Sequence, residues 1–265
     1  MRRNNLFWGA VILLVGVLLL LNSLNLLPGS FWTFFWPLLV ILLGVWFLLS
    51  PAIDRGSREV KELSIPLEDA SSAEVELHHG AGRIQLGSAV APGMLLQGTF
   101  LEGVEHSIQR SGDRVRLALR PPHGMVFPFP PFGYTQGLRW DLNLARGIPM
   151  KLLIESGASE TVADLTDLQV NELHVKTGAS STRLSLPAQA GYTRVHIEAG
   201  VAGVDVRIPQ GVAARIRIDS GLSGINVDTN RFPRSPAGYE TPGYDSATQR
   251  AEIYIQTGMG GIDVR

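Results

Sequence analysis

The side chains best able to do chemistry recur at fixed distances from a repeated glycine. Two residues before this glycine, successive copies of the repeat carry mostly charged side chains: Glu155, Lys176, Glu198, Asp219 and Gln256. Four residues before it, two neighbouring copies carry His174 and His196, and five residues after it, two carry Asp205 and Asp263. Paired carboxylates hydrolyse glycosidic bonds, and neighbouring imidazoles can bind zinc.

These columns mix signs and sizes and do not converge on one place, whereas a glycosidase needs two carboxylates across a cleft and a metal needs three or four ligands. We therefore predict a solvated ladder of side chains, with a ligand-binding face as the alternative. No catalytic, cofactor or metal site is expected, and no cofactor. The adjacent His78 and His79 would face opposite sides of a strand.

Other motifs also argue against an enzyme. The segment GAGRIQ around Gly80 lacks the third glycine of a dinucleotide-binding loop, and no GxSxG, HExxH or P-loop motif occurs. The chain has no cysteine, which excludes disulfides and thiol catalysis. Its net charge of −1 gives no general attraction to nucleic acid, so no nucleic-acid partner is expected.

The elements that position these side chains form a repeat. Its copies are aligned on five glycines: Gly157, Gly178, Gly200, Gly221 and Gly258. The intervals are 21, 22, 21 and 37 residues, and a fainter copy surrounds Gly80. A fixed period of this length indicates a solenoid. The longer last interval contains an inserted loop at about 230–249.

Within each copy, apolar residues alternate before the glycine and again after it, as in Val195, Ile197, Val204 and Val206. Period two predicts two short strands with one face inward. The residue before the glycine is small, and the glycine suits a corner with positive φ or with close backbone approach. Stacked copies would form a β-solenoid with a ~21-residue repeat. The last copy ends at Arg265, so we expect it to form the open end of the stack.

The first 50 residues form a predicted transmembrane hairpin. Two apolar segments, at about 6–27 and 31–49, each approach the roughly 20 residues that cross a bilayer as a helix. Basic residues flank both outer ends, and the connection between the segments is uncharged. The positive-inside rule then places both termini and the β domain in the cytoplasm, as a multi-pass protein of the cell membrane.

The remaining sequence divides at composition changes. Residues 51–62 are a charged juxtamembrane linker, 63–150 an N-terminal β region, and 151–265 the repeat solenoid. Within the N-terminal region, 121–137 is a Pro/Phe-rich loop. This loop packs on the solenoid or contacts a partner or membrane through its aromatic side chains: Phe127, Phe129, Phe132 and Tyr134.

The chain resembles a bacterial family. The hairpin NNLFWGAVILLVGVLLLLNSLNL…FWPLLVILLGVWFLL is similar to the LiaI/LiaF-type transmembrane region. The segments VELHHGAGRIQLG and LHVKTGASSTRLSLP resemble the toast-rack domain of LiaF-like proteins, also called cell-wall-active antibiotic response proteins. The resemblance implies a modulator of envelope-stress signalling that acts on a sensor histidine kinase. This chain has two spans where the better-known LiaF proteins are predicted to have four.

The sequence as a whole predicts a membrane-anchored all-β protein with two N-terminal transmembrane helices and a toast-rack-like solenoid. We expect a non-enzymatic regulatory or interaction protein of the bacterial envelope, with the lipid bilayer and a membrane protein as partners. The alternatives are a self-assembling, bactofilin-like scaffold, which would make the protein a homo-oligomer, and a surface adhesin or glycan-binding solenoid.

Overall fold

The computed structural model describes residues 36, 37, 40, 60–122 and 138–265. The two predicted spans lie outside these residues, apart from positions 36, 37 and 40, which are helical. Most of the predicted linker and the aromatic residues of the Pro/Phe-rich loop lie outside them as well. Within the described residues, every helix is too short or too polar to cross a bilayer.

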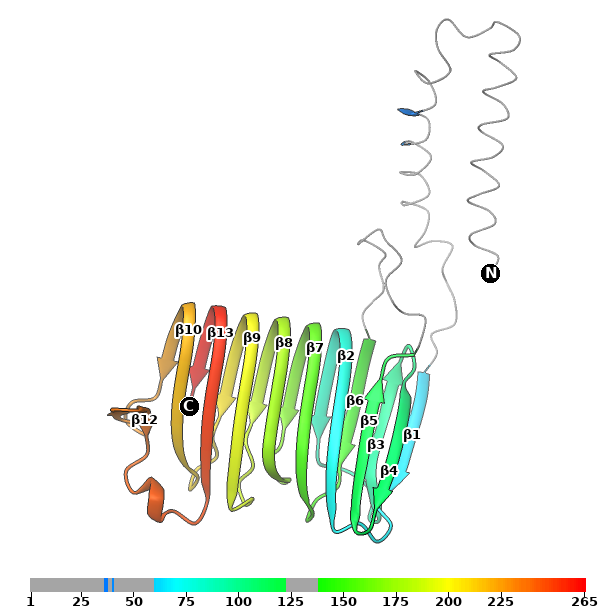
Figure 1. Cartoon of the computed structure of the whole chain (residues 1–265), viewed down its shortest axis with the longest axis horizontal. Coiled ribbons are helices and arrows are strands. Elements are labelled where there is room, and N and C mark those ends of the chain that lie inside the picture. Colours follow the sequence, from blue (N-terminus) through cyan, green and yellow to red (C-terminus); the bar gives the residue numbers. More distant parts are fainter. Residues whose placement is uncertain (1–35, 38–39, 41–59, 123–137) are drawn as a thin grey trace, which may run out of the picture. The chain divides into compact units, whose positions relative to one another are not determined.

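The described β region is a single sheet of thirteen strands (Figure 1). The strands are β1 Val60–Pro66, β2 Ser72–Gly87, β3 Met94–Leu101, β4 Glu105–Ser111, β5 Arg114–Arg120, β6 Leu138–Leu144, β7 Pro149–Asp164, β8 Gln169–Ser185, β9 Tyr192–Arg207, β10 Ala213–Val227, β11 Arg234–Ser235, β12 Gly238–Glu240 and β13 Arg250–Val264. A short 3₁₀ turn, η1, covers Tyr244–Ser246.

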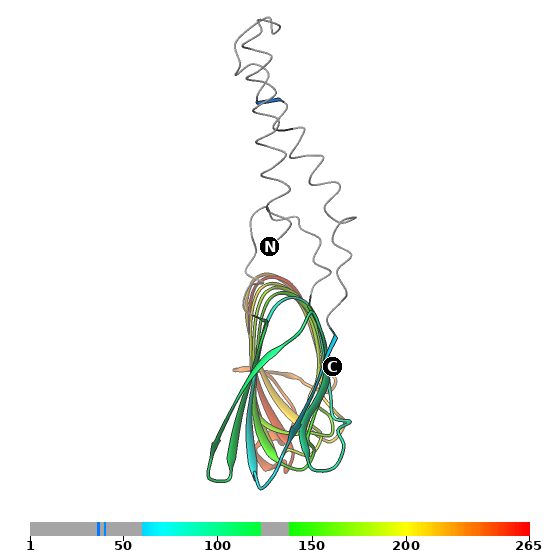
Figure 2. The ribbon, with the colours of Figure 1, turned by 90° about the vertical axis from the view of Figure 1, so that its right-hand side faces the viewer.

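Six long strands make the repeating part: β2, β7, β8, β9, β13 and β10 pair in parallel along the stack. Each is an arch with two legs, and Figure 2 shows the arches nearly end-on. We call the bends at the repeated glycines the crest. Alternation within each leg points apolar side chains into the space between the legs.

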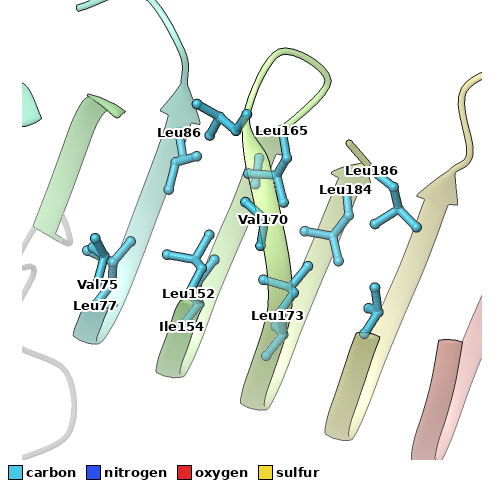
Figure 3. Packing of buried hydrophobic residues seen from close by; sticks show 14 of the residues in the cluster. Val75, Leu77, Leu86, Leu152, Ile154, Leu165, Val170, Leu173, Leu184 and Leu186 are labelled. Carbon is cyan, nitrogen blue, oxygen red and sulfur yellow. The ribbon is translucent and has the colours of Figure 1, made fainter. Parts of the chain in front are cut away.

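The core therefore fills the inside of the arches. In β8, Leu173 and Val175 come from the first leg and Leu184 from the second, and all three are fully buried. Equivalent side chains of neighbouring strands continue the same columns (Figure 3). Burying each such side chain stabilises the fold by about 1.5–3 kcal/mol, so these columns hold the stack together.

The repeated glycines are required by close backbone approach. A Cβ added to Gly178 would lie 2.8 Å from the carbonyl oxygen of Gly157, and one added to Gly200 would lie 2.8 Å from that of Gly178. None of the five repeat glycines has a positive φ. The sequence allows two explanations for the glycine at each corner, a positive φ or close backbone approach. The structure selects close approach between neighbouring arches.

The N-terminal strands extend the two legs separately. Antiparallel strands β3 and β1 follow β6, which pairs with the second leg of β2. Strand β5 pairs with the first leg of β2, and β4 is antiparallel to β5. Between these layers lie the fully buried rings of Phe100 and Trp140, whose centroids are 5.5 Å apart.

The order of the last arches corrects the expectation that the final copy forms the open end. Strand β13 lies between β9 and β10, so β10 is the last arch of the stack (Figure 1). An inner arch buries its apolar columns from both sides, and β13 has complete ones: Ile253, Ile255, Ile262 and Val264 are all buried. In β10 the expected inward residue Ile225 is 44% exposed because no further arch covers it.

Candidate interaction surface

The two histidines singled out from the sequence do lie side by side. The ring centroids of His174 and His196 are 5.7 Å apart, and His196 stacks on Tyr254 at 5.0 Å. Each imidazole binds a carboxylate of its own strand, His174 to Glu172 at 2.9 Å and His196 to Glu198 at 2.8 Å. In the described parts of the chain, no group of three or more potential metal-ligating side chains occurs.

Three carboxylates of the first legs, Glu155, Glu172 and Glu198, contact basic side chains of the stack. Glu155 accepts a hydrogen bond from His78 at 2.9 Å, and Lys176 lies 3.4 Å from Glu198. Hydrogen bonds from Lys151 and then His174 lower the pKa of Glu172 to about 2. Lys151 and Lys176 form ion pairs with Glu172 and Glu198 of the neighbouring strands, which accounts for the mixed signs.

The two aspartates of the second legs are also neutralised locally. Asp205 and Asp263 are directly paired on β9 and β13. Arg265 lies 2.6 Å from Asp205 and 4.0 Å from Asp263, and Asn226 donates to Asp263 at 2.7 Å. Both carboxylates lie side by side on the outer face of two neighbouring second legs, which is not the arrangement of an acid and a nucleophile across a cleft.

The two adjacent histidines of β2 face opposite sides, as their spacing predicts. His78 reaches the outer ladder, whereas His79 is buried with its ring 5.1 Å from Trp140. The Nε2–H of His79 donates to the carbonyl of Leu138 at 3.2 Å. Burial lowers the pKa of His79 to about 4, so the ring is neutral at physiological pH.

A groove follows the crest across all six arches. Its lining includes four of the glycines at the bends, Gly80, Gly200, Gly221 and Gly258, and one flank carries His78, Glu155, Lys176, Glu198, Gln256 and Asp219. Its volume of about 890 Å³ is within the range of ligand pockets, but it is open along its length. Such a groove suits an extended segment lying across the arches better than an enclosed small molecule.

Beside the glycines, the crest presents a column of apolar side chains. The residue that follows each repeated glycine is exposed and apolar, and pairing aligns these residues along the stack: Ala158, Ala179, Val201, Met259 and Leu222. Val201 is 58% exposed, Met259 49% and Leu222 75%. We call this column the crest surface.

The crest surface was not found by sequence reasoning, although a signal for it exists. Each bend has an apolar residue in the position after the glycine, as in GVAG, GLSG and GMGG. In an isolated turn this residue would attract no attention. Only the parallel register brings the five together into one exposed column, and such patches often mark interaction sites.

The chain enters the β region at the level of the crest. Val60, the first residue of β1, is opposite Leu101, which is opposite Arg139. Arg139 is in turn opposite Arg83, three residues beyond Gly80. The chain also leaves the described region at Pro122 and returns at Leu138, the partner of Gly82. The predicted contact residues Phe127, Phe129, Phe132 and Tyr134 lie between these points, outside the described residues.

Most of the described β region matches a known family. The family model for the N-terminal domain of toast_rack matches residues 54–207, more than half of the chain. The chain belongs to the toast-rack family. The match includes strands β1 to β9 of the toast-rack sheet, and the LiaI-LiaF-like transmembrane region matches residues 6–48. The resemblance seen in the sequence is thereby confirmed, and with it the association of this toast-rack protein with a membrane.

One solved structure supports the fold. A proposed cell adhesion protein from Clostridium sporogenes superposes with a TM-score of 0.70 at 20% identity, over 78% of this chain and 99% of that chain. A proposed adhesin from Bacteroides fragilis aligns with a TM-score of only 0.28 at 9% identity, over 79% of this chain and 98% of that chain. None of the curated proteins matches the sequence.

Proposed function

We propose that this toast-rack protein is a non-enzymatic, membrane-anchored regulator in the bacterial envelope-stress response. Its crest surface contacts a membrane protein partner, in the manner of LiaF-like modulators of sensor histidine kinases. The residues matched by the LiaI-LiaF-like region supply the anchor as two transmembrane helices. Basic residues at both ends of the hairpin favour a cytoplasmic β region.

The position of the crest surface is the observation that carries this proposal. Residues 50–59 connect the second predicted span to Val60, and ten residues reach at most about 35 Å when extended. Because Val60 lies at the level of the crest, a linker of this length can hold the exposed column of Val201, Met259 and Leu222 near the bilayer. An apolar surface held there favours a partner that is itself in the membrane.

The test replaces two crest side chains by charges. We expect Val201→Asp combined with Met259→Asp to leave the fold intact, because both residues are about half exposed or more. The variant should reproduce most of the change in an envelope-stress reporter that deletion of the protein causes, because a charge in the contact must be desolvated. Reporter output and protein level are measured in the same cells.

A matched control adds two negative charges far from the crest, at the exposed Asn171 and Gln210. Asn171→Asp with Gln210→Asp should behave like the wild type. Equal activity of the crest and control variants would show that the crest surface is not the contact. If the protein level of the crest variant alone falls, the milder double variant Val201→Ser with Met259→Ser is tested. That variant must then show the same loss of regulation at a normal protein level.

A second candidate is adhesion at the cell surface. It is favoured by the toast-rack fold of the Clostridium sporogenes protein, which has been proposed to act in cell adhesion. Adhesion requires the β region to lie outside the cell, whereas kinase regulation from the inner face requires it in the cytoplasm. The side of the membrane therefore separates the two candidates.

A further inference from the structure

We propose that the last arch, β10, pairs with β10 of a second copy, antiparallel and crest to crest. The two sheets would then continue into one another. Within the described part of the chain, residues 217–227 pair with β13 on one side and with no strand on the other. Strand β12 covers only Arg215 and Ile216 of the free side. Eleven residues of parallel-sheet edge are thus left open, and an open edge is a template for strand pairing.

The inner face of this arch lacks the cover that the other arches have. Ile225 is 44% exposed, while its partner Ile262 on β13 is 2% exposed. The Oγ of Ser223 is buried without a hydrogen-bond partner. In the equivalent position of β8, Ser180 donates to Thr177 at 2.8 Å. The bond in β8 lies within one arch, so the exposed Ile225 is the feature that calls for a further arch, and such an arch could also offer Ser223 a partner.

The free edge is nearly symmetric about its bend, which favours a second copy as the occupant. Inward residues are Ile218 and Ser220 before the bend, and Ser223 and Ile225 after it. In the crest-to-crest antiparallel register, Ile218 of one copy lies opposite Ile225 of the other, and Ser220 lies opposite Ser223. Ser220 of the second copy then offers Ser223 the hydroxyl that it lacks.

The alternation of inward and outward side chains restricts the register further. A slip by one residue would place inward side chains opposite outward ones and expose the apolar columns. The paired register also brings Arg217 opposite the uncharged Asn226, so no like charges meet there. The contact is isologous, as in most homodimers, because each copy uses the same edge.

The direction of the two-fold axis is compatible with both copies being anchored in one membrane. The proposed pairing itself does not depend on the membrane anchor. In a crest-to-crest pair the axis passes through the crest, so both crests and both copies of Val60 lie on the same side. The opposite end of the stack differs from β10. It ends in the two separate strands β1 and β4 instead of one continuous arch. A dimer that closes is therefore favoured over an open filament.

A single cysteine tests the pairing, since the natural chain has none. In the proposed dimer, residue 222 lies beside its own copy across the axis, with a Cα separation of about 6 Å from strand spacing and rise. A disulfide needs a Cα separation of 4.4–6.8 Å. We expect full-length Leu222→Cys, oxidised in native membranes with copper phenanthroline, to give a covalent dimer on a non-reducing gel.

The matched control is Met259→Cys, which is also exposed on the crest but one arch further back. Its two copies would be about 10 Å further apart, so it should remain a monomer. The proposal is overturned if Leu222→Cys gives no dimer, or if both variants cross-link equally, as random collision would. A dimer held by the membrane helices alone would also fail to cross-link at residue 222.

A second pair of variants, one on the free edge and one control, tests whether the exposed Ile225 is part of the contact. Ile225→Lys places an inward charge on the free edge and should abolish the cross-link of Leu222→Cys, whereas Met259→Lys in the same background should keep it. Persistence of the cross-link with Ile225→Lys would contradict the register. Particles of the detergent-solubilised wild type larger than a dimer would instead indicate an open stack. Neither result bears on the crest contact, whose test uses Val201 and Met259.

Discussion

At the scale of single residues, the repeated glycines define how closely the arches approach. The sequence was sufficient to place the corners, because a glycine preceded by a small residue recurs at a fixed distance from each apolar pair. It could not distinguish positive φ from close approach, because both demand glycine. The distance of 2.8 Å between a Cβ added at Gly178 and the oxygen of Gly157 decides the question.

A substitution in this column should therefore cost more than one beside it. We expect Gly178→Ala to lower the free energy of unfolding by about 1–3 kcal/mol, because the methyl group must displace a neighbouring backbone. Gly203→Ala is the control, since an added Cβ there meets nothing within 4 Å. Thermal unfolding of the full-length proteins in detergent, followed by circular dichroism, compares the two. Equal midpoints would mean that the arches can spread at no cost.

The buried His79 predicts a pH dependence of stability. Its pKa is about 4 in the folded protein, against an ordinary 6.5, so the unfolded chain binds its proton more tightly. Stability from this group is complete above pH 6.5 and is lost as the pH falls toward 4, by about 3 kcal/mol. Urea unfolding at pH 7 and pH 5 should show a smaller loss for His79→Gln than for the wild type. The same loss in both proteins would assign the dependence to other groups.

At the scale of elements, alternation predicted the strands and their inward faces, but not the order of the last two arches. The copies in β10 and β13 have similar patterns, and either could follow β9. The choice depends on burial: β13 fills an inner position with four buried aliphatic side chains, and β10 tolerates partial exposure at the end. Such a difference arises only when the whole stack is assembled.

Paired cysteines can measure this order. Met259 lies directly opposite both Val201 and Leu222, which are therefore two arches apart. We expect Val201→Cys with Met259→Cys to form an intramolecular disulfide on oxidation, detected as the loss of free thiols in the monomer band. Val201→Cys with Leu222→Cys should keep its thiols within the monomer, because the sulfurs are about 10 Å apart. A stack in chain order would give the opposite result.

At the scale of the whole molecule, the sequence predicted an anchored all-β protein of the toast-rack family, and the family is confirmed. The crest surface could not be predicted, because it exists only where five arches align. The aromatic residues chosen from composition, Phe127 to Tyr134, lie in a segment outside the described structure. Their role as a partner contact stays a prediction.

The side of the membrane on which the toast-rack domain lies can be measured directly. Ala237 is exposed in the loop between β11 and β12, and the chain has no other thiol. We expect Ala237→Cys to be protected from a membrane-impermeant maleimide in intact cells and labelled after lysis, because the positive-inside rule places the domain in the cytoplasm. Labelling of intact cells would overturn that topology and favour adhesion.

The position of β13 also has a consequence for how the protein is made. Strand β10 leaves the ribosome before β13, yet its place in the stack is beyond β13. The place between β9 and β10 is filled by residues 250–264, which are translated after β10. The stack therefore cannot be completed until β13 has been translated, and a chain that stops short of residue 250 lacks the strand that joins β9 to β10.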